Sequence, residues 1–525
     1  MKNFIIFFFV LSLLIPAAVF SGGSSAGRGA ETNSVAFNKE GYPIVTAPYT
    51  LKAVTVKQQF TRLYDQLPAF QRLEAKTGVH IDWDYIGADW ATQKPLVLAS
   101  GDLPDIFYGR TVLTEDDVIS NRELFYNLTP LIDQYGNNLK NIFQENPIML
   151  NLAKAYDGNI WGLPHRQFYR PQNYALWMIN QNWLDKLGLS MPTTTDELIT
   201  VLRAFKNGDP NGNGKADEIP WSWTWVSGIA GPMDIFGAFG VVIDSSNSGF
   251  LSVTNGKVQY VFAQDGFQDG VAYLHQLYAE GLIDQEVFTH DNSMWRAKVL
   301  QNDPEIVGMF GQWGRSSFIG ADRAAYYPMV MPLKGPKGYQ FWDQNPEVTE
   351  YARYTFEISK ACTRPEIAMR WIDTIYDDMT SLEVFLGTDN LKMLDNGRIE
   401  VIESGNDKWI YGLNDLFAGY ASDQLNSKLI MTVEDEMMAD KKRLSAYYPK
   451  EYYPYGMVAM TPQEVDELAL LRTDIQSFAM QQTATWITKG GVENEYAGFI
   501  KQLENMGLRR MEQIYQQIYD RYIGK

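Results

Sequence analysis

Leu-Lys-Ala-Val-Thr-Val, residues 51–56, alternates apolar and polar side chains in the manner of a β-strand. Residues 70–78 have the spacing of a helix that ends at Gly78, and residues 80–85 alternate again. A second helix is predicted over 92–100, and a third strand begins within 102–107. Strands that alternate with helices in this way form parallel sheets, so the predicted fold class is α/β.

Length and composition narrow the class of protein. With 525 residues the chain exceeds one ordinary domain of about 100–200 residues, so two large lobes or three smaller ones are expected. The net charge of −18 argues against a nucleic-acid binder, because no stripe of Lys and Arg is available for the phosphates. The single cysteine, Cys362, excludes an intramolecular disulfide framework. Aromatic residues make up 14% of the chain, enough to supply stacking surfaces for sugar rings besides a core.

The N-terminus has the pattern of a secretory signal. A basic start precedes an apolar run that ends at Phe20, so residues 1–20 are predicted to be a signal peptide. Residues 21–45 begin with small residues and are predicted to form a flexible tether. Ser21 stands where a bacterial lipoprotein would carry its lipidated cysteine, which leaves lipidation open. No later run of about 18 apolar residues follows, so we expect an extracytoplasmic protein that meets the membrane only through its N-terminus, if at all.

Residues 209–218, Asp-Pro-Asn-Gly-Asn-Gly-Lys-Ala-Asp-Glu, predict a calcium loop. Oxygen-bearing side chains at alternate positions can converge on a hard cation, and Gly214 allows the sharp turn between them. An EF-hand would end on a Glu where this chain has Pro220, so we expect a loop that closes at Glu218. The alternative is a polar Asn-Gly turn without metal. The predicted ligands of a structural Ca²⁺ are Asp209, Asn211, Asn213, the main-chain carbonyl of Lys215, Asp217 and Glu218.

Several motifs follow one another in a characteristic order. Among them are Ser-Gly-Asp-Leu-Pro-Asp-Ile at 100–106, Asp-Gly-Asn-Ile-Trp-Gly-Leu-Pro at 157–164, the helix starts at 183–189 and 192–198, and the loop at 209–220. With these motifs the chain resembles extracellular solute-binding protein family 1 of the ABC importers. It is most similar to the long, lipoprotein-like branch that includes alginate-oligosaccharide binders, and the resemblance extends over roughly residues 50 to 522.

The resemblance implies a two-lobed periplasmic-binding-protein-like fold of the class II type. Each lobe would be a sheet flanked by helices, with the ligand held in the cleft between the lobes and released by hinge motion. The implied crossings between lobes lie near Phe168–Tyr174, Trp313–Ser317 and Cys362–Pro365. Lobe 1 would then contain residues 46–170 and 315–363, and lobe 2 residues 171–314 and 364–525. The expected protein is a monomer that passes its ligand to the transmembrane subunits of an ABC permease.

Candidate ligand contacts lie where strands end or where the lobes are expected to meet. Sugar rings need flat apolar surfaces, and their hydroxyls need charged or amide partners. Tyr108 and Arg110 follow the strand that ends at Phe107, and Trp223 is the middle one of three alternating tryptophans beyond the calcium loop. The candidates at the expected crossings are Arg166, Tyr169, Arg170, Trp313 and Arg315. The alternative for the aromatic residues is core packing, and for the arginines it is ion pairing.

The leading hypothesis for function is a binding protein that captures a carbohydrate, in particular an oligosaccharide. A secreted glycoside hydrolase is the first alternative, since any of many carboxylate pairs can be about 5–10 Å apart. A protein that presents its ligand to a receptor is the second. The chain contains neither an HExxH motif nor a P-loop, and its four histidines lack the spacing of metal ligands, so we do not expect an enzyme.

Overall fold

The computed structural model describes residues 35–57, 61–87, 89–168, 175–225, 232–243, 249–343, 350–403 and 407–525. The predicted signal peptide and residues 21–34 of the predicted tether lie outside these ranges. Residues 35–45 differ from the prediction of a flexible tether. Ile44 and Val45 are buried, and both backbone amides donate to the carbonyl of Thr77, so this stretch packs onto the first lobe.

Lobe 1 is built on a five-stranded sheet with the order β2-β1-β3-β11-β4. β1 pairs in parallel with both β2 and β3, which confirms the predicted α/β beginning. β11 is antiparallel to its neighbours and enters the sheet from far along the chain. The strands are β1 (Tyr49–Val56), β2 (Val79–Ile86), β3 (Ile106–Tyr108), β4 (Leu163–Arg166) and β11 (Tyr351–Ile358).

Helices cover this sheet, and a small second sheet of β12 (Leu391–Met393), β13 (Ile399–Val401) and β14 (Leu429–Ile430) lies beyond them. Gly78 ends α1 in the left-handed conformation with φ 74°, as its position in the sequence predicts. The helices of lobe 1 are α1 (Pro68–Thr77), α2 (Trp90–Ser100), α3 (Glu115–Ser120), α4 (Thr129–Tyr135), α5 (Asn137–Glu145), α6 (Pro147–Ala153), α14 (Pro365–Ile375), α15 (Asp378–Leu386) and α16 (Asp423–Asn426).

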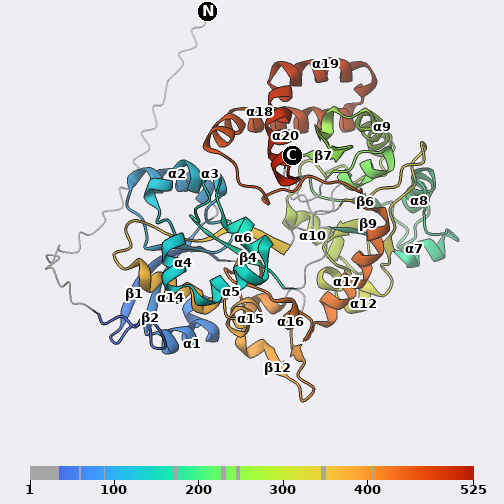
Figure 1. Ribbon diagram of the computed structural model, residues 1–525. Helices are drawn as coiled ribbons and strands as arrows, with labels where there is room; N and C mark the ends of the chain where they lie inside the picture. The colour runs from blue at the N-terminus through green and yellow to red at the C-terminus, as the bar shows by residue number, and fades with distance from the viewer. Residues whose placement is uncertain are drawn as a thin grey trace, which may run out of the picture.

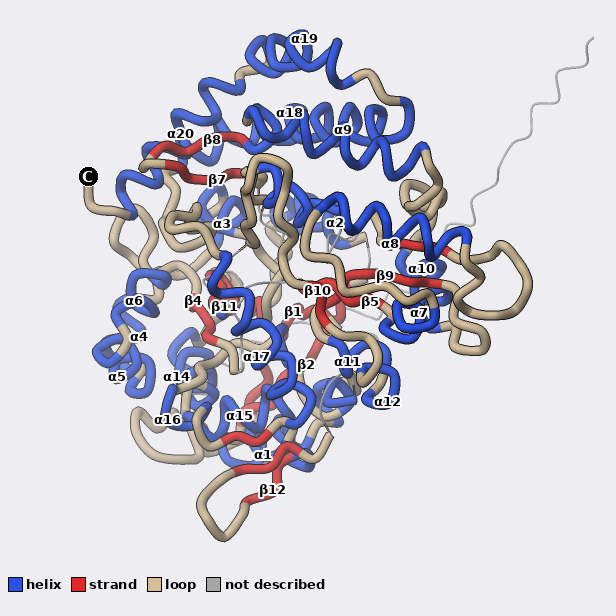
Figure 2. Tube along the Cα trace, turned by 90° about the vertical axis from the view of Figure 1, so that its right-hand side faces the viewer, coloured by secondary structure: helices blue, strands red, loops and turns tan. Residues whose placement is uncertain are grey.

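Lobe 2 is built on a four-stranded sheet with the order β10-β5-β9-β6 and carries a separate hairpin, β7-β8. The strands are β5 (Leu176–Ile179), β6 (Ile219–Ser222), β7 (Leu251–Thr254), β8 (Lys257–Tyr260), β9 (Val307–Gln312) and β10 (Met329–Val330). The helices are α7 (Gln181–Lys186), α8 (Thr195–Asn207), α9 (Asp265–Ala279), α10 (Asn292–Leu300), α11 (Arg315–Ile319), α12 (Ala321–Ala324), α17 (Thr432–Leu444), α18 (Pro462–Lys489), α19 (Val492–Asn505) and α20 (Leu508–Tyr522). Figure 2 shows α18 and α9 side by side at the far end of this lobe, with α19 outside them.

α18 is the longest helix of the described chain, and a capping box determines where it begins. Thr461 accepts from the Glu464 amide while the Glu464 carboxylate accepts from the Thr461 amide, and Pro462 occupies the first turn. The side chain of Asn180 caps α7 by accepting from the Trp183 amide. Within the described ranges, no helix combines the length and the apolar character that a membrane crossing requires.

Two separate hydrophobic cores define the lobes (Figure 1). Phe168 packs in the first core and Ala175 in the second, so the chain leaves lobe 1 between them. This is where the first crossing is predicted, although residues 169–174 themselves lie outside the described ranges. In Figure 1 the orange elements α14, α15 and α16 lie beside the blue N-terminal elements, while the red C-terminal helices lie with the green ones.

The other two predicted crossings are wrong. Trp342 packs in the core of lobe 2 and Tyr351 against that of lobe 1, so the chain returns between them and not near Trp313–Ser317. The last crossing comes after Met431, which is still in the first core, and before Leu444, which is in the second. Lobe 1 thus contains residues 35–168 and 350–431, and lobe 2 residues 175–343 and 432–525, which corrects the predicted boundaries. The predicted return was too early because β10 hydrogen-bonds to β5, which keeps the chain in lobe 2 beyond residue 317. Pairing between strands that are distant in sequence leaves no local pattern in the sequence.

Candidate functional site

A single stretch of chain, residues 449–461, lines three cavities at and beside the junction of the lobes; we call it the connecting segment. Two of the cavities, of about 600 and 230 Å³, have walls from both lobes. Tyr351 and Met457 line both of these, so the two cavities adjoin. The volume of the larger one is typical of sites for small organic ligands.

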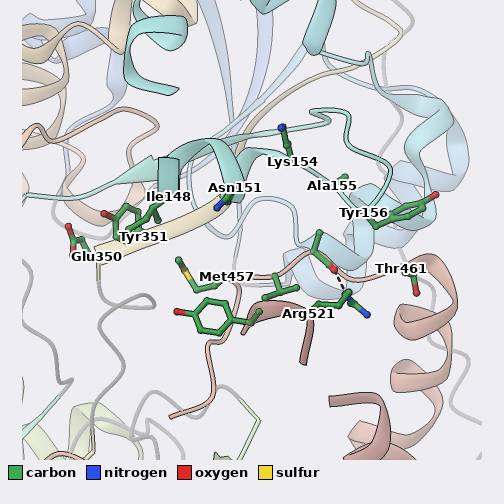
Figure 3. Close-up of a pocket in the computed structure, with 13 residues that line it drawn as sticks. Ile148, Asn151, Lys154, Ala155, Tyr156, Glu350, Tyr351, Met457, Thr461 and Arg521 are labelled. Atoms are coloured by element: carbon green, nitrogen blue, oxygen red, sulfur yellow. Dashed lines mark hydrogen bonds between the residues drawn. The ribbon is translucent and has the colours of Figure 1, made fainter. Parts of the chain in front are cut away.

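The larger interlobe cavity has α6 and its C-terminal continuation on one side and the connecting segment with the end of α20 on the other (Figure 3). It combines three phenol rings with an amide, an ammonium group and a carboxylate, a mixture that suits a ligand rich in hydroxyls. Arg521 also lines it but donates to the Ala459 carbonyl at 3.1 Å and pairs with Glu464 at 2.6 Å, so this guanidinium mainly fixes the wall. The lining residues that carry the ligand chemistry are Asn151, Lys154, Tyr156, Glu350, Tyr351 and Tyr522.

Burial raises the pKa of Tyr351 to about 12, although Arg166 nearby lowers it. The phenol is therefore protonated at neutral pH and can donate to a ligand oxygen. These cavity residues lie in or beside α6, β11 and α20, which are distant in sequence and meet only in the folded protein. None of them is among the ligand contacts predicted from the sequence, because no local pattern distinguishes them.

Among the predicted ligand contacts, Arg110 has the position that best suits contact with a ligand. It lines the smaller interlobe cavity, and its guanidinium makes no hydrogen bond or ion pair with any residue in the described part of the chain. Its amide donates to the Leu416 carbonyl at 3.3 Å, and Gly109 before it has φ 105° with no room for a Cβ, which would lie 2.7 Å from the same carbonyl. The backbone is therefore held firmly while the side chain is left for a ligand.

The carboxylate of Glu115 connects residues from the two lobes beside this cavity. Glu115 pairs with Arg353 at 3.1 Å and accepts from the backbone amide of Met460, in the connecting segment, at 3.2 Å. Burial raises the pKa of Glu115 even though the Arg353 charge opposes the shift. On the same side Arg472 of α18 pairs with Asp116 of α3 at 3.4 Å, so charged groups link the lobes there.

Two of the predicted aromatic contacts lie in the hydrophobic cores. The Tyr108 ring is fully buried between Trp83 and Trp371, and Trp223 is 1% exposed and packs edge-on against Trp221. Neither ring offers a surface to a ligand, which corrects both predictions. Trp313 differs, because it is only half-buried at the end of β9, and it remains a predicted contact.

Two of the predicted arginines have structural partners. Arg166 bridges Glu350 at 2.5 Å and Asp423 at 2.6 Å, and Arg315 pairs with Glu436 at 2.9 Å and Asp440 at 2.7 Å. The geometry thus favours the ion-pair alternative for both. Tyr169 and Arg170 lie outside the described residues.

The predicted calcium loop connects α8 to β6 and already has the shape of an ion site. Gly212 and Gly214 have φ near +73° and Asp209 has φ 44°, so the loop curls around its own side chains. The amides of Asn211 and Asn213 donate to the Asp217 carboxylate at 3.0–3.1 Å, and the Asn211 hydrogen bond is the main reason that the pKa of Asp217 is lowered. Lys186 reaches in from α7 and donates to the Asp209 and Pro210 carbonyls at 3.2 and 2.9 Å.

Two oxygen atoms in this loop have no hydrogen-bond partner in the part of the chain that the structure describes. They are Oδ1 of Asp209 and Oε1 of Glu218, and both are buried. Burial raises the pKa of Glu218, and the neighbouring carboxylates of Asp217 and Asp209 add to that shift. Unpartnered buried carboxylate oxygens close to further carboxylates are what a cation would satisfy, so the residues present fit calcium.

Among the residues that the structure describes, Asp284, Glu286 and His290 form a group of possible metal ligands that already has a cation in it. Their ligand atoms lie within 4.8 Å of one another. The ammonium group of Lys298 lies 2.8 Å from Asp284 and 2.6 Å from Glu286. The lysine supplies the positive charge, so this cluster needs no metal ion.

Comparisons with known proteins find relatives over most of the chain. The "fructooligosaccharide ABC transporter substrate-binding protein FusA" of Streptococcus pneumoniae serotype 4 is 32% identical over 480 residues, 86% of each chain. The solved structure of FusA in complex with kestose has a TM-score of 0.82 and 30% identity, covering 90% of this chain and 99% of that one. A further FusA structure is that of an EF-hand mutant with fructo-nystose, also with a TM-score of 0.82. No family model matches the chain.

A second protein of known structure has a similar fold. It is a human-milk-oligosaccharide (HMO) binding, ABC-transporter associated solute-binding protein from Bifidobacterium longum infantis. Its TM-score is 0.80 at 26% identity, and the match covers 91% of this chain and 99% of that chain. The similarity includes both lobes in every one of these structures, so the two-lobed fold is confirmed.

Proposed function

The chain belongs to the substrate-binding proteins of ABC transporters, as its resemblance to solute-binding family 1 predicts, and we propose that it captures a neutral oligosaccharide between its lobes. Members of this family bind a solute and deliver it; they are not enzymes, so the hydrolase hypothesis is set aside. We further propose that the protein works as a monomer outside the cytoplasmic membrane. Its partners would be the transmembrane subunits of an ABC permease.

The observation that carries this proposal is the pair of adjoining cavities between the lobes. Their walls come from both lobes, so a ligand in them touches both and favours the arrangement in which the lobes are close. The phenol rings provide apolar faces for sugar rings, while Arg110, Asn151 and Glu350 provide partners for hydroxyl groups. The fructo-oligosaccharide in the name of the FusA relative suggests oligomers of fructose as the first ligands to test.

Calcium is the proposed structural ion of the loop at 209–218. Asp209, Asn211, Asn213, Asp217 and Glu218 would hold it through side-chain oxygens, and Lys215 through its carbonyl. Bound there, the ion would offset the charges of Asp209, Asp217 and Glu218, which act on one another, and fix the loop that leads into β6. Two findings support this: the buried oxygens of Asp209 and Glu218 lack partners among the described residues, and a FusA variant is described as an EF-hand mutant.

A thermal-shift screen followed by calorimetry tests the function. The protein would be mixed with fructo-oligosaccharides, other neutral oligosaccharides and uronic-acid oligosaccharides, with calcium or with EDTA. We expect stabilisation by a neutral oligosaccharide that is recovered intact. Shortened products, or stabilisation only by uronic-acid oligomers, would contradict the proposal.

A further inference from the structure

The third cavity along the connecting segment lies within lobe 2 and has a volume of about 710 Å³. Its walls are the β7 hairpin strand, the stretch 339–343 and the start of the connecting segment. Aromatic side chains dominate the lining: Tyr339, Phe341, Tyr452, Tyr453 and Tyr455. We call it the aromatic cavity. None of the ligand contacts predicted from the sequence lies in it.

The rings of this cavity are fixed in place before any ligand arrives. Tyr453 is buried and packs against Tyr515 at 5.6 Å, and Tyr455 packs edge-on against Tyr453 at 4.8 Å. The Tyr455 hydroxyl accepts from the Leu251 amide at 2.7 Å, which attaches the connecting segment to β7. Rigid rings lose little conformational entropy when they stack on a ligand.

Tyr339 presents an open ring face at the edge of the cavity. A Cβ at Gly240, which has φ 87°, would lie 3.0 Å from this ring, so the absence of a side chain there lets the ring lie flat against the backbone. Its residue is nevertheless 44% exposed, and Phe341 lies beside it with ring centroids 6.2 Å apart and an interplanar angle of 32°. Two neighbouring, gently tilted rings form a platform of the kind that stacks on the C–H face of a sugar.

The charges around the platform select against an anionic ligand. Two carboxylates, Asp343 and Glu451, line the cavity, against one cation, Lys450. Glu451 accepts from the Gly256 amide at 3.1 Å with both oxygens, and Gln264 donates to the Ser252 hydroxyl, so polar groups are held around the rings. Carboxylates accept hydrogen bonds from sugar hydroxyls but repel uronates and phosphates.

The aromatic cavity adjoins the interlobe cavities. Tyr455 lines both the aromatic cavity and the smaller interlobe cavity, which in turn shares Tyr351 and Met457 with the larger one. We infer that the aromatic cavity is a separate sugar subsite, which takes the far, uncharged units of an oligosaccharide whose other end lies between the lobes. The inference rests on the proposed function, and it adds that affinity rises with chain length.

Calorimetric titration with inulin-type fructo-oligosaccharides of three and six units tests the subsite. We expect the parent protein to bind the six-unit chain at least tenfold more tightly than the three-unit chain. The double variant Tyr339→Ala, Phe341→Ala should lose that difference through weaker binding of the six-unit chain, while its affinity for the three-unit chain is unchanged. Tyr339→Phe retains the ring and should behave as the parent does.

Tyr42→Ala is the matched control, because Tyr42 is 46% exposed, lies in lobe 1 and lines none of the three cavities. It should leave both affinities unchanged. Equal affinity of the parent for the two chains, or equal loss of both affinities in the double variant, would overturn the subsite while leaving the proposed function intact. A parent protein that binds neither chain would overturn the subsite for fructose oligomers, whereas the proposed function would fall only if no neutral oligosaccharide binds. Retained folding of each variant is checked by its unfolding temperature.

Discussion

The ammonium nitrogen of Lys441 lies 3.5 Å from the centroid of the Trp313 ring. Lys441 is 1% exposed and belongs to α17, whereas Trp313 directly follows β9 of the four-stranded sheet of lobe 2. A desolvated ammonium group over the face of an indole is a strong form of cation–π contact. One face of this ring is therefore in contact with α17.

Replacing Trp313 tests whether the ring contacts sugar. Trp313→Leu should weaken oligosaccharide binding about tenfold, since it removes a stacking surface. Trp313→Phe keeps a ring for both the sugar and Lys441, so it should lose much less affinity. The measurement is the dissociation constant from calorimetry together with the unfolding temperature. If Trp313→Leu lowers only the unfolding temperature, the ring serves solely to position α17.

The two arginines at 110 and 315 should respond oppositely to the same substitution. Arg110→Ala removes a guanidinium that has no partner among the described residues, so we expect about tenfold weaker sugar binding and little change in stability. Arg315→Ala breaks contacts with Glu436, Asp440 and the Ala324 carbonyl, so it should cost about 1–3 kcal/mol of unfolding free energy and leave the affinity unchanged. Calorimetry and denaturant unfolding separate the two effects. Unchanged sugar affinity in Arg110→Ala would exclude that residue from the site.

Calcium should stabilise the protein through the loop at 209–218. The double variant Asp209→Ala, Asp217→Ala removes two of the three carboxylates, so we expect calcium binding and the calcium-dependent rise of several degrees in unfolding temperature to be lost. Asp185→Ala, which changes an exposed aspartate on α7, is the control and should keep both. A double variant that EDTA still destabilises as much as the parent would show that the ion lies elsewhere.

The titration of Asp373 should make the stability of lobe 1 depend on pH. Burial raises the pKa of Asp373 to about 6, in spite of the hydrogen bonds that its carboxylate accepts from Leu139 at 2.9 Å and Asn138 at 3.2 Å. The ordinary value is near 3.9, so the folded state binds this proton more tightly than the unfolded state does. Protonation therefore favours folding: the contribution of Asp373 to stability rises as pH falls from above 6 to below 4.

Asp373→Asn removes this titration while keeping an oxygen that can cap α5. The slope of unfolding free energy against pH between 4 and 7 should change in the variant, with a span on the order of 3 kcal/mol removed. Denaturant unfolding at several pH values measures it. Asp377→Asn, at the cap of α15, controls for loss of a capping carboxylate in general. Identical slopes in the parent and in Asp373→Asn would contradict the assignment.

Local signals in the sequence predicted the parts of the fold that depend on neighbours along the chain. The alternation at 51–56 and the helix end at Gly78 are both found as predicted, because each is decided by residues close together along the chain. The crossings were predicted less well, since whether β10 joins β5 or another sheet depends on residues far away in sequence.

The predictions of the ligand contacts also succeeded where residues close in sequence decide the structure and failed where distant residues do. Alternating tryptophans suggested a stacking surface at Trp223, but a buried strand end has the same pattern, and the ring lies in the core. Arg110 in the smaller interlobe cavity was predicted, but the residues of the larger one were missed because they lie in or beside α6, β11 and α20, none of which has a motif. The loop at 209–218 could be proposed as a calcium site from the sequence because all of its predicted ligands lie within ten consecutive residues.

The position of β11 has a consequence for how the protein is made. This strand lies between β3 and β4 in the sheet of lobe 1, yet residues 351–358 are synthesised after every strand of the four-stranded sheet of lobe 2. As the chain emerges from the ribosome, the second sheet can form before the first is complete, and β3 and β4 must wait with unpaired edges. Unpaired strand edges invite aggregation, so the order of synthesis makes the N-terminal lobe the more vulnerable one until its late strand arrives.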